Sequence, residues 1–415
     1  MDPATTAWLA LLSGAGLIGL VFGLFAAATR YCNMGAIADW VNMGDTGRFR
    51  AWLLSIAVAA AGVAILEFSG WLSLDETRAG YRMAEFPILR YLLGGLTFGV
   101  GMVLAGGCTT RTLVRIGSGN LQAVLVYLLV GLTAAGLLYL PGVRIWTEQA
   151  LHWPGWSFQG LGLPGQDLGT LASALPTTLP LAALRLGATA LMVALLAWLI
   201  WRLSRGQAMR PRDQVGGLTI GLAVIAGWAL TASPAGTALM TEATAAFTPP
   251  AGTGAQSLTF VAPAAELLRF GTSPSLALLT FGLAAMLGVI LGSGLWFVYR
   301  GQWRWQGFGN RSEWIRQGVG AVLMGAGGVV AMGCSVGQGI TGVSTLALGS
   351  LTALAGMMLG SFLALKVLFY RVVYPDAGLP TVFLALATDV KLRPASQHPL
   401  AGDITPERRP RSCRD

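Results

Sequence analysis

Three cysteines each stand at the end of an apolar stretch, where the chain turns abruptly to glycine and polar side chains. They are Cys32 in "RYCNMGAI", Cys108 in "AGGCTTRTLVRIGSGN" and Cys334 in "GCSVGQGITG". A thiol buried in an apolar wall stays neutral, and a neutral thiol offers a weak S–H donor and a soft, polarizable sulfur. Such groups suit the loose, repeated binding of a soft, sulfur-bearing anion that conduction requires.

Two of these motifs belong to an internal repeat. The stretch "RYLLGGLTFGVGMVLAGGCTT" (90–110) aligns at one constant offset with "RQGVGAVLMGAGGVVAMGCSV" (316–336). The matched pairs are Arg90 with Arg316, Gly94 with Gly320, Gly99 with Gly325, Gly101 with Gly327, Gly107 with Gly333 and Cys108 with Cys334. The topology below starts one copy outside and the other inside, so we predict an inverted repeat with halves of about 7–140 and 217–370.

The apolar stretches before Cys108 and Cys334 are short. Each runs roughly 15 residues from its flanking arginine, less than the roughly 20 that a membrane span needs. We therefore expect both cysteines within the membrane, on short broken or re-entrant helices that line a polar cavity. Thr109, Thr110 and Ser335 are predicted to cap the broken helices, whose free N–H groups favour an anion.

Composition identifies the surroundings as a lipid bilayer. The chain has 415 residues, of which 54% are hydrophobic and 11% charged, whereas soluble domains carry about 25% charged residues. Apolar runs of spanning length predict an all-α polytopic membrane protein with about nine spans. The predicted spans are 7–29, 51–73, 91–106, 120–140, 185–203, 217–232, 274–299, 318–332 and 350–370.

The net charge of +9 arises from arginines between spans and in the tail, a pattern of membrane orientation rather than of nucleic-acid binding. The basic loops around 202–212 and 300–316 place the N-terminus outside and the C-terminus in the cytoplasm. We predict one transmembrane domain over 1–370 and a partly disordered cytoplasmic tail over 371–415. With two histidines and no GxxxxGK[ST] loop, the sequence indicates no metal cluster, cofactor or ATP hydrolysis.

Several polar residues allow two interpretations. Arg111 and Arg115 either attract an anion or anchor the chain at the cytoplasmic face. Glu67 lies inside a predicted span, where an acid is a functional candidate, or it pairs with a loop arginine near the interface. The long segments 141–184 and 233–272 have compositions that point to no chemistry, and Cys413 in the tail is interpreted as incidental.

The three cysteine motifs, with "STLALGS" after the last, closely resemble the YeeE/YedE family of bacterial inner-membrane proteins over about residues 14–370. The resemblance implies thiosulfate uptake through an inverted-repeat fold, with Cys32, Cys108 and Cys334 passing the ion along by S–H contacts. It also implies a small cytoplasmic TusA-type sulfur carrier as a partner. Arg111, which aligns with Gly337 in the repeat, departs from the family pattern and is expected to strengthen anion binding or alter which anion passes.

The sequence thus predicts a transporter, not an enzyme, that carries a sulfur-containing anion inward. The predicted substrate-binding residues are Cys32, Cys108, Cys334, Gly107, Thr109, Thr110, Arg111, Gly333, Ser335 and Gln338. Three alternatives stay open: a membrane sulfurtransferase or thiol oxidoreductase, a passive channel or subunit that recruits a partner, and a transporter of another sulfur or selenium compound. The enzyme would need a low-pKa thiolate with a nearby base or resolving cysteine, and the chain contains no CxxC.

Overall fold

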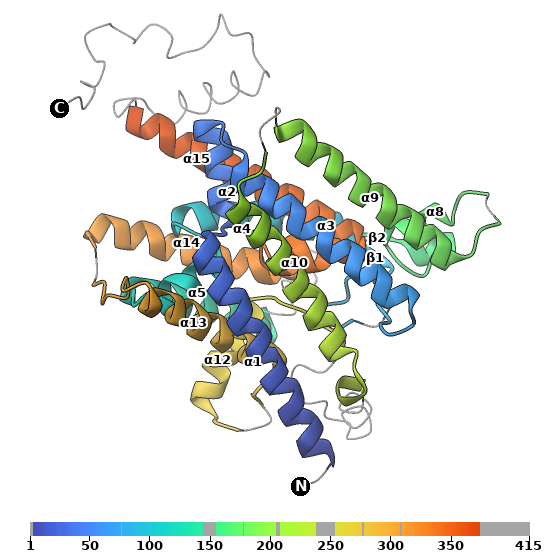
Figure 1. Cartoon of the computed structure of the whole chain (residues 1–415), viewed down its shortest axis with the longest axis horizontal. Helices are drawn as coiled ribbons and strands as arrows, with labels where there is room; N and C mark the ends of the chain where they lie inside the picture. Colours follow the sequence, from blue (N-terminus) through green and yellow to red (C-terminus); the bar gives the residue numbers. More distant parts are fainter. Residues whose placement is uncertain are drawn as a thin grey trace, which may run out of the picture. The chain divides into compact units, whose positions relative to one another are not determined.

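A computed structural model gives the fold (Figure 1) and describes residues 3–75, 77–143, 155–176, 178–204, 208–237, 254–275, 278–307 and 309–373. The chain divides into two compact units, Met1–Ser361 and Phe362–Asp415. The first unit contains all three cysteine motifs. From residue 374 onward the predicted tail, with Cys413, lies outside the described residues.

Helices dominate the described chain. The N-terminal part consists of α1 (Pro3–Thr29), α2 (Asn33–Met43), α3 (Gly47–Phe68), α4 (Ile88–Leu104), α5 (Thr109–Gly117) and α6 (Leu121–Tyr139). A connecting region follows, with β2 (Gly155–Ser157), η1 (Phe158–Leu161), α8 (Leu168–Ala172) and α9 (Leu181–Ser204). Its strand β2 pairs antiparallel with β1 (Glu85–Pro87), which lies between α3 and α4. The C-terminal part consists of α10 (Pro211–Thr231), α12 (Ala262–Thr272), α13 (Phe281–Tyr299), α14 (Arg311–Val330), η3 (Gly337–Gly342), η4 (Val343–Thr345) and α15 (Leu348–Val373).

The all-α membrane architecture predicted from composition is confirmed. Within the described residues, eight helical segments are long and apolar enough to cross a membrane. Each of the nine predicted spans falls on one of the helices, and α14 is the one not among those eight. Its first two turns carry Arg311, Glu313 and Arg316, which leave too short an apolar stretch for a full span.

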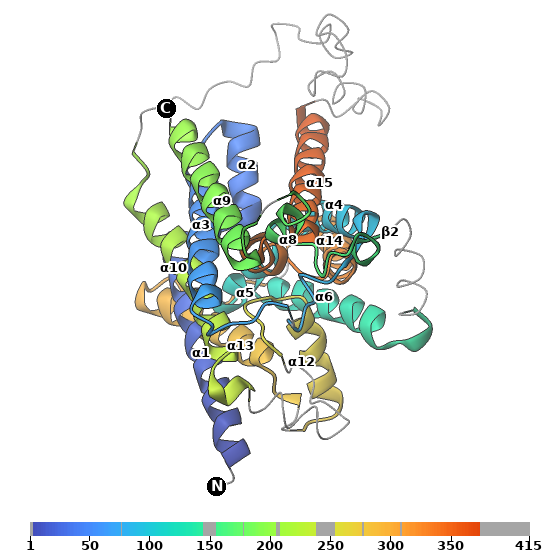
Figure 2. The same ribbon diagram turned by 90° about the vertical axis from the view of Figure 1, so that its right-hand side faces the viewer.

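The two aligned repeat segments pack against each other as antiparallel helices, α4 and α14 (Figure 2). A Cβ on Gly94 would lie 2.4 Å from the backbone nitrogen of Ala331, and a Cβ on its repeat partner Gly320 would lie 2.3 Å from that of Ala105. Gly101 and Gly327 likewise meet the backbones of Met324 and Phe98. When each residue is replaced by its aligned partner in the other repeat segment, the contact of Gly94 with Ala331 becomes that of Gly320 with Ala105. This symmetry supports the predicted repeat.

Glycine also sets the packing of the longer helices. On α1, a Cβ at Gly19 or Gly23 would lie about 2 Å from the carbonyl oxygens of Ala285 and Val289 on α13. On α10, a Cβ at Gly217 would lie 2.6 Å from the carbonyl oxygen of Ala51 on α3, and one at Gly221 would lie 2.9 Å from that of Ser55. Helix α3 also packs against α9 (Figure 1). Lipid provides little hydrophobic drive between helices, so such close backbone approach is the source of their contact energy.

Candidate functional site

Each of the three cysteines follows the same backbone turn. The helix before it ends in a residue with left-handed φ, two positions before the cysteine. These residues are Arg30 (φ 57°), Gly106 (φ 76°) and Met332 (φ 61°). In each turn the next N–H bonds back to a carbonyl five residues earlier: Tyr31 to Ala26 (3.0 Å), Gly107 to Met102 (2.9 Å) and Gly333 to Gly328 (2.8 Å). This is the Schellman ending of a helix.

The turn places each cysteine at the start of a new helical segment. Cys32 precedes α2, and its Sγ accepts a hydrogen bond from the N–H of Gly35 at 3.2 Å. Cys334 precedes the π-helical turn η3, and its Sγ accepts from the N–H of Gly337 at 3.3 Å. Cys108 occupies the N-cap position of α5 without such a bond. All three are free thiols and are almost fully buried.

The prediction that Thr109, Thr110 and Ser335 cap the broken helices is wrong. Two cysteines take the place predicted for these hydroxyls. The extended backbone that a cap requires falls at Cys108, one residue before Thr109, and the thiol of Cys334, one residue before Ser335, accepts from the N–H of Gly337. The three hydroxyl oxygens are buried instead and have no hydrogen-bond partner. They are therefore available to another molecule.

The three cysteine turns converge, although they are far apart in sequence. The side-chain amide of Asn33 donates to the backbone carbonyl of Ser335 at 3.1 Å. The thiols of Cys32 and Cys108 lie within interaction distance of each other, and the Cys108 thiol also faces Ser335. The Cys334 thiol lies 3.9 Å from the hydroxyl oxygen of Thr259. We call Cys32, Cys108 and Cys334 with the residue that follows each, Asn33, Thr109 and Ser335, the thiol cluster.

Unsatisfied polar atoms gather at this cluster. Buried side-chain oxygens without a hydrogen-bond partner include those of Asn33 (Oδ1), Thr109, Thr110, Ser335 and Gln338 (Oε1). Buried polar groups are normally paired, and each unpaired one costs about 1–3 kcal/mol. Such a concentration beside three thiols is typical of a site that a ligand or water completes.

A long side chain lies close against each of Gly107 and Gly333, the glycines that precede Cys108 and Cys334. A Cβ on Gly107 would come within 2.9 Å of the Arg111 side chain, and one on Gly333 within 3.0 Å of that of Gln338. Both long side chains therefore fold back over the glycine before the cysteine. The Gln338 amide donates to the carbonyl of Ala331 at 2.6 Å, which anchors this arrangement in the second repeat.

Arg111 supplies positive charge beside the thiols. It lies in the first turn of α5, is half-buried and exerts its field on Cys32. In the part of the chain that the structure describes, Arg111 forms no ion pair, whereas nearby Arg48 is held by Asp39 at 2.5 Å. An unpaired cation in a half-buried position favours a bound anion.

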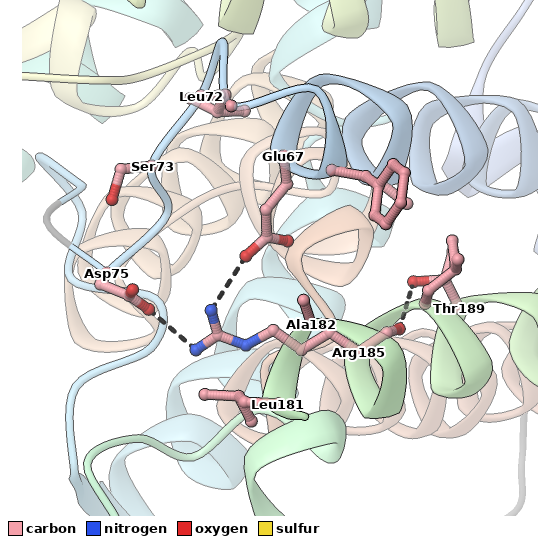
Figure 3. Close-up of a pocket in the computed structure, with 12 residues that line it drawn as sticks. Glu67, Leu72, Ser73, Asp75, Leu181, Ala182, Arg185 and Thr189 are labelled. Atoms are coloured by element: carbon pink, nitrogen blue, oxygen red, sulfur yellow. Dashed lines mark hydrogen bonds and ion pairs between the residues drawn. The ribbon is translucent and has the colours of Figure 1, made fainter. Parts of the chain in front are cut away.

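Glu67 is not part of the thiol cluster. It pairs with Arg82 and, at 3.0 Å, with Arg185 (Figure 3). The pair with Arg82, which lies between α3 and α4, confirms the interpretation that Glu67 pairs with a loop arginine. Asp75 (2.8 Å) and Asp167 (3.2 Å) complete this ionic network around Arg185, beside a cavity of about 410 Å³. Burial alone would raise the pKa of the Asp167 carboxyl, but Arg82, Thr170 and Arg185 together hold it below its usual range.

Hydrogen bonds from Arg82, a member of the ionic network, and from its neighbour Tyr81 hold the segment between α3 and α4 against η3 and η4. Arg82 donates from Nε to the carbonyl of Thr345 at 3.0 Å, and the hydroxyl of the neighbouring Tyr81 donates to the carbonyl of Gly337 at 2.9 Å. Sequence reasoning missed Asp167 and Thr259, which lie in long segments of uninformative composition. The sequence offered one signal, an "Asp-Leu-Gly-Thr" helix start at Asp167, whose carboxylate accepts from the N–H of Thr170 at 3.0 Å.

Buried thiols on broken helices inside a bundle of apolar spans define a polytopic membrane transport protein. The chain belongs to the sulphur transport family, whose model matches residues 28–363. It is 27% identical over 380 residues to the thiosulfate transporter TsuA of Escherichia coli (strain K12), an alignment covering 87% of this chain and 95% of that protein. It is 26% identical over 356 residues to the thiosulfate transporter TsuA of Spirochaeta thermophila, covering 86% and 98% of the two chains.

Proposed function

We propose that this protein carries thiosulfate across the membrane through the thiol cluster. The observation that carries the proposal is the convergence of three identical helix–turn–cysteine segments on one set of unpartnered buried polar atoms. Curated relatives that share nearly the whole chain are named thiosulfate transporters.

The chemistry of the cluster matches a small dianion that must be bound and released. Neutral S–H groups are weak donors, so each holds the ion loosely. The hydroxyls of Thr109 and Ser335 add further donors, and Arg111 adds charge. Because the thiols of Cys32 and Cys108 are neighbours and Ser335 links them to Cys334, the ion passes between sites without returning to water. Weak binding at successive sites permits conduction.

We further propose that the protein lies in a bacterial inner membrane with its N-terminus outside and its C-terminus in the cytoplasm. The arginine-rich segments around residues 30–50, 202–212 and 300–316 then face the cytoplasm. In this orientation α14 runs toward the outside and leads into the turn with Cys334, and α4 runs toward the inside and leads into the turn with Cys108. The ion then meets Cys334 first.

The decisive experiment is uptake of radiolabelled thiosulfate into proteoliposomes that contain purified wild-type protein, Cys32→Ala, Cys108→Ala or Cys334→Ala. We expect uptake by wild type and its loss in each variant, with thermal unfolding of the variants unchanged. Uptake that survives all three substitutions would leave the thiols as packing residues. Competition with other sulfur and selenium anions in the same vesicles then ranks the substrates and tests whether thiosulfate is preferred.

The cytoplasmic partner in this proposal is a small TusA-type sulfur carrier that receives the product at the inner face. We expect such a carrier to bind inside-out vesicles that contain the protein and not empty vesicles. A variant truncated after residue 390 tests the alternative of a partner-recruiting subunit. Thiosulfate uptake by the truncated protein at the wild-type rate favours a self-contained transporter, and its complete loss favours the alternative.

A further inference from the structure

The cavity of about 410 Å³ beside the ionic network opens between α3 and α9, two helices that are long and apolar enough to cross a membrane. Glu67 lies in the last turn of α3, and Arg185 lies near the start of α9. The cavity is therefore at the end of two spans, the depth at which lipid headgroups meet water. Trp71, which is half-exposed and follows the lining residue Gly70, is typical of this depth.

The charges on the cavity wall favour a cation. Figure 3 shows Glu67 and Asp75 directed at Arg185, so two carboxylates surround one guanidinium. Every nitrogen of that guanidinium already donates to a carboxylate: Nη1 to Glu67 (3.0 Å), Nη2 to Asp75 (2.8 Å) and Nε to Asp167 (3.2 Å). The Asp75 side chain is nevertheless 62% exposed. A positively charged group in the cavity can thus reach a carboxylate, whereas an anion meets a cation that is already neutralised.

The rest of the wall is apolar and continues along the lipid-facing surface. Phe68 and Leu186 line the cavity and are 69% and 43% exposed. Ala190, Val193 and Ala197 continue the face of Leu186 along α9 at helical spacing, and none of the three is buried. A ligand with a cationic end and a hydrocarbon chain therefore matches both parts of this surface.

We propose that this cavity binds a phospholipid whose headgroup ends in a primary ammonium. An ammonium has three N–H donors, which match the carboxylate of Asp75 and the hydroxyl of Ser73 on the same wall. Hydrogen bonds between two charged groups are the stronger kind, and a quaternary choline headgroup has no N–H to donate. The site goes beyond thiosulfate transport and does not depend on it. Its ligand stabilises α9 against α3 and the ionic network between them.

Native mass spectrometry of the purified protein tests the headgroup with two phospholipids of identical acyl chains, phosphatidylethanolamine and phosphatidylcholine. We expect wild type to bind the ethanolamine lipid at least about tenfold more tightly, the effect of a charge-assisted hydrogen bond that choline cannot donate. Asp75→Asn should abolish this preference by weakening binding of the ethanolamine lipid. Asp45→Asn is the matched control and should keep the preference, because Asp45 is also exposed and paired with an arginine but precedes the opposite end of α3.

Ala182→Trp tests the cavity without removing a charge. Ala182 lines the cavity and is exposed, so a large side chain there should occupy the cavity and weaken binding of the ethanolamine lipid by at least about tenfold. Ala194→Trp, at an exposed position of α9 outside the cavity wall, should bind like wild type. Because a ligand of the folded state raises its melting temperature, the ethanolamine lipid should also protect wild type from thermal unfolding more than the choline lipid does.

Equal affinity of wild type for the two lipids would overturn the inference, and so would tighter binding of the anionic phosphatidylglycerol. A folded Asp75→Asn variant that keeps the preference would also overturn it, because the headgroup would then lie elsewhere. If Asp75→Asn does not fold, Ala182→Trp decides: wild-type binding of the ethanolamine lipid by this variant contradicts the site, and weaker binding supports it. Thiosulfate enters none of these measurements, so failure of this inference leaves the proposed function standing, and the reverse holds as well.

Discussion

The side-chain amide of Asn33 donates a hydrogen bond to the backbone carbonyl of Ser335, 3.1 Å away and 302 residues along the chain. This bond joins the start of α2 to the turn that carries Cys334. Because both groups are buried, neither has water as an alternative partner. The bond therefore fixes the distance between two cysteine turns that belong to different halves of the chain.

Replacing Asn33 with Leu should loosen this connection at similar side-chain volume. The Ser335 carbonyl loses its donor in a buried position, so we expect a loss of about 1–3 kcal/mol in unfolding free energy and lower thiosulfate uptake. Thermal unfolding in detergent and proteoliposome uptake measure the two effects. Ser69→Ala, which removes an exposed hydroxyl bonded to Leu66, should change neither. Equal behaviour of the two variants would mean that the Asn33 bond contributes nothing to the site.

The left-handed turn before Cys108 should tolerate only glycine without cost. A Cβ on Gly106 would meet nothing closer than Arg115 Nη1 at 3.9 Å, so Gly106→Ala tests the backbone conformation and not steric overlap. We expect a loss of about 1–2 kcal/mol, the strain of a side chain at left-handed φ. Gly136→Ala, a helical position with equal space, should stabilise instead. Melting temperatures that shift in the same direction would contradict this account of the turn.

Asp167→Asn should show, through the pH dependence of the melting temperature, how much the charge of Asp167 in the ionic network stabilises the fold. Because Arg82, Thr170 and Arg185 hold the Asp167 pKa below its unfolded value of about 3.9, its ionised form stabilises the folded state at neutral pH. That contribution is fully present above the unfolded pKa and is lost as pH falls through the folded pKa. We expect the wild type to melt above the variant at pH 7 and the gap to narrow below about pH 4. A gap that is constant over this range would show that the charge of Asp167 does not stabilise the fold.

Thiosulfate should protect the cluster thiols from a small thiol reagent. In a Cys413→Ser background, methanethiosulfonate labelling of Cys32, Cys108 and Cys334 should be slow, because all three are almost fully buried. Added thiosulfate should slow it further by occupying the cluster, whereas chloride at equal ionic strength should not. Mass spectrometry of the labelled peptides assigns the protection to each cysteine. Labelling rates that do not respond to thiosulfate would place the ion elsewhere.

Local patterns in the sequence were enough to predict a polytopic membrane protein and its helices, and to single out the three cysteine motifs. Hydropathy places the spans, because a bilayer demands long apolar helices whatever their neighbours. The aligned glycines predicted the internal repeat, and in the structure Gly94 and Gly320 each contact the other repeat segment. These features depend on residues within one helix or on one repeated pattern.

The tertiary structure decided how the distant groups combine. Asn33 contacts Ser335, and Thr259 contacts Cys334, across long stretches of sequence. Such contacts arise in a bundle in which α1 packs on α13 and α4 on α14. The tertiary structure also decided that the thiols of Cys32 and Cys334, and not the hydroxyls of Thr109, Thr110 and Ser335, accept backbone N–H groups at the starts of helical segments. Asp167 joined Arg82 and Arg185 from a segment whose composition indicated no chemistry. Such contacts depend on the register of packed helices, which residue spacing along a single chain does not encode.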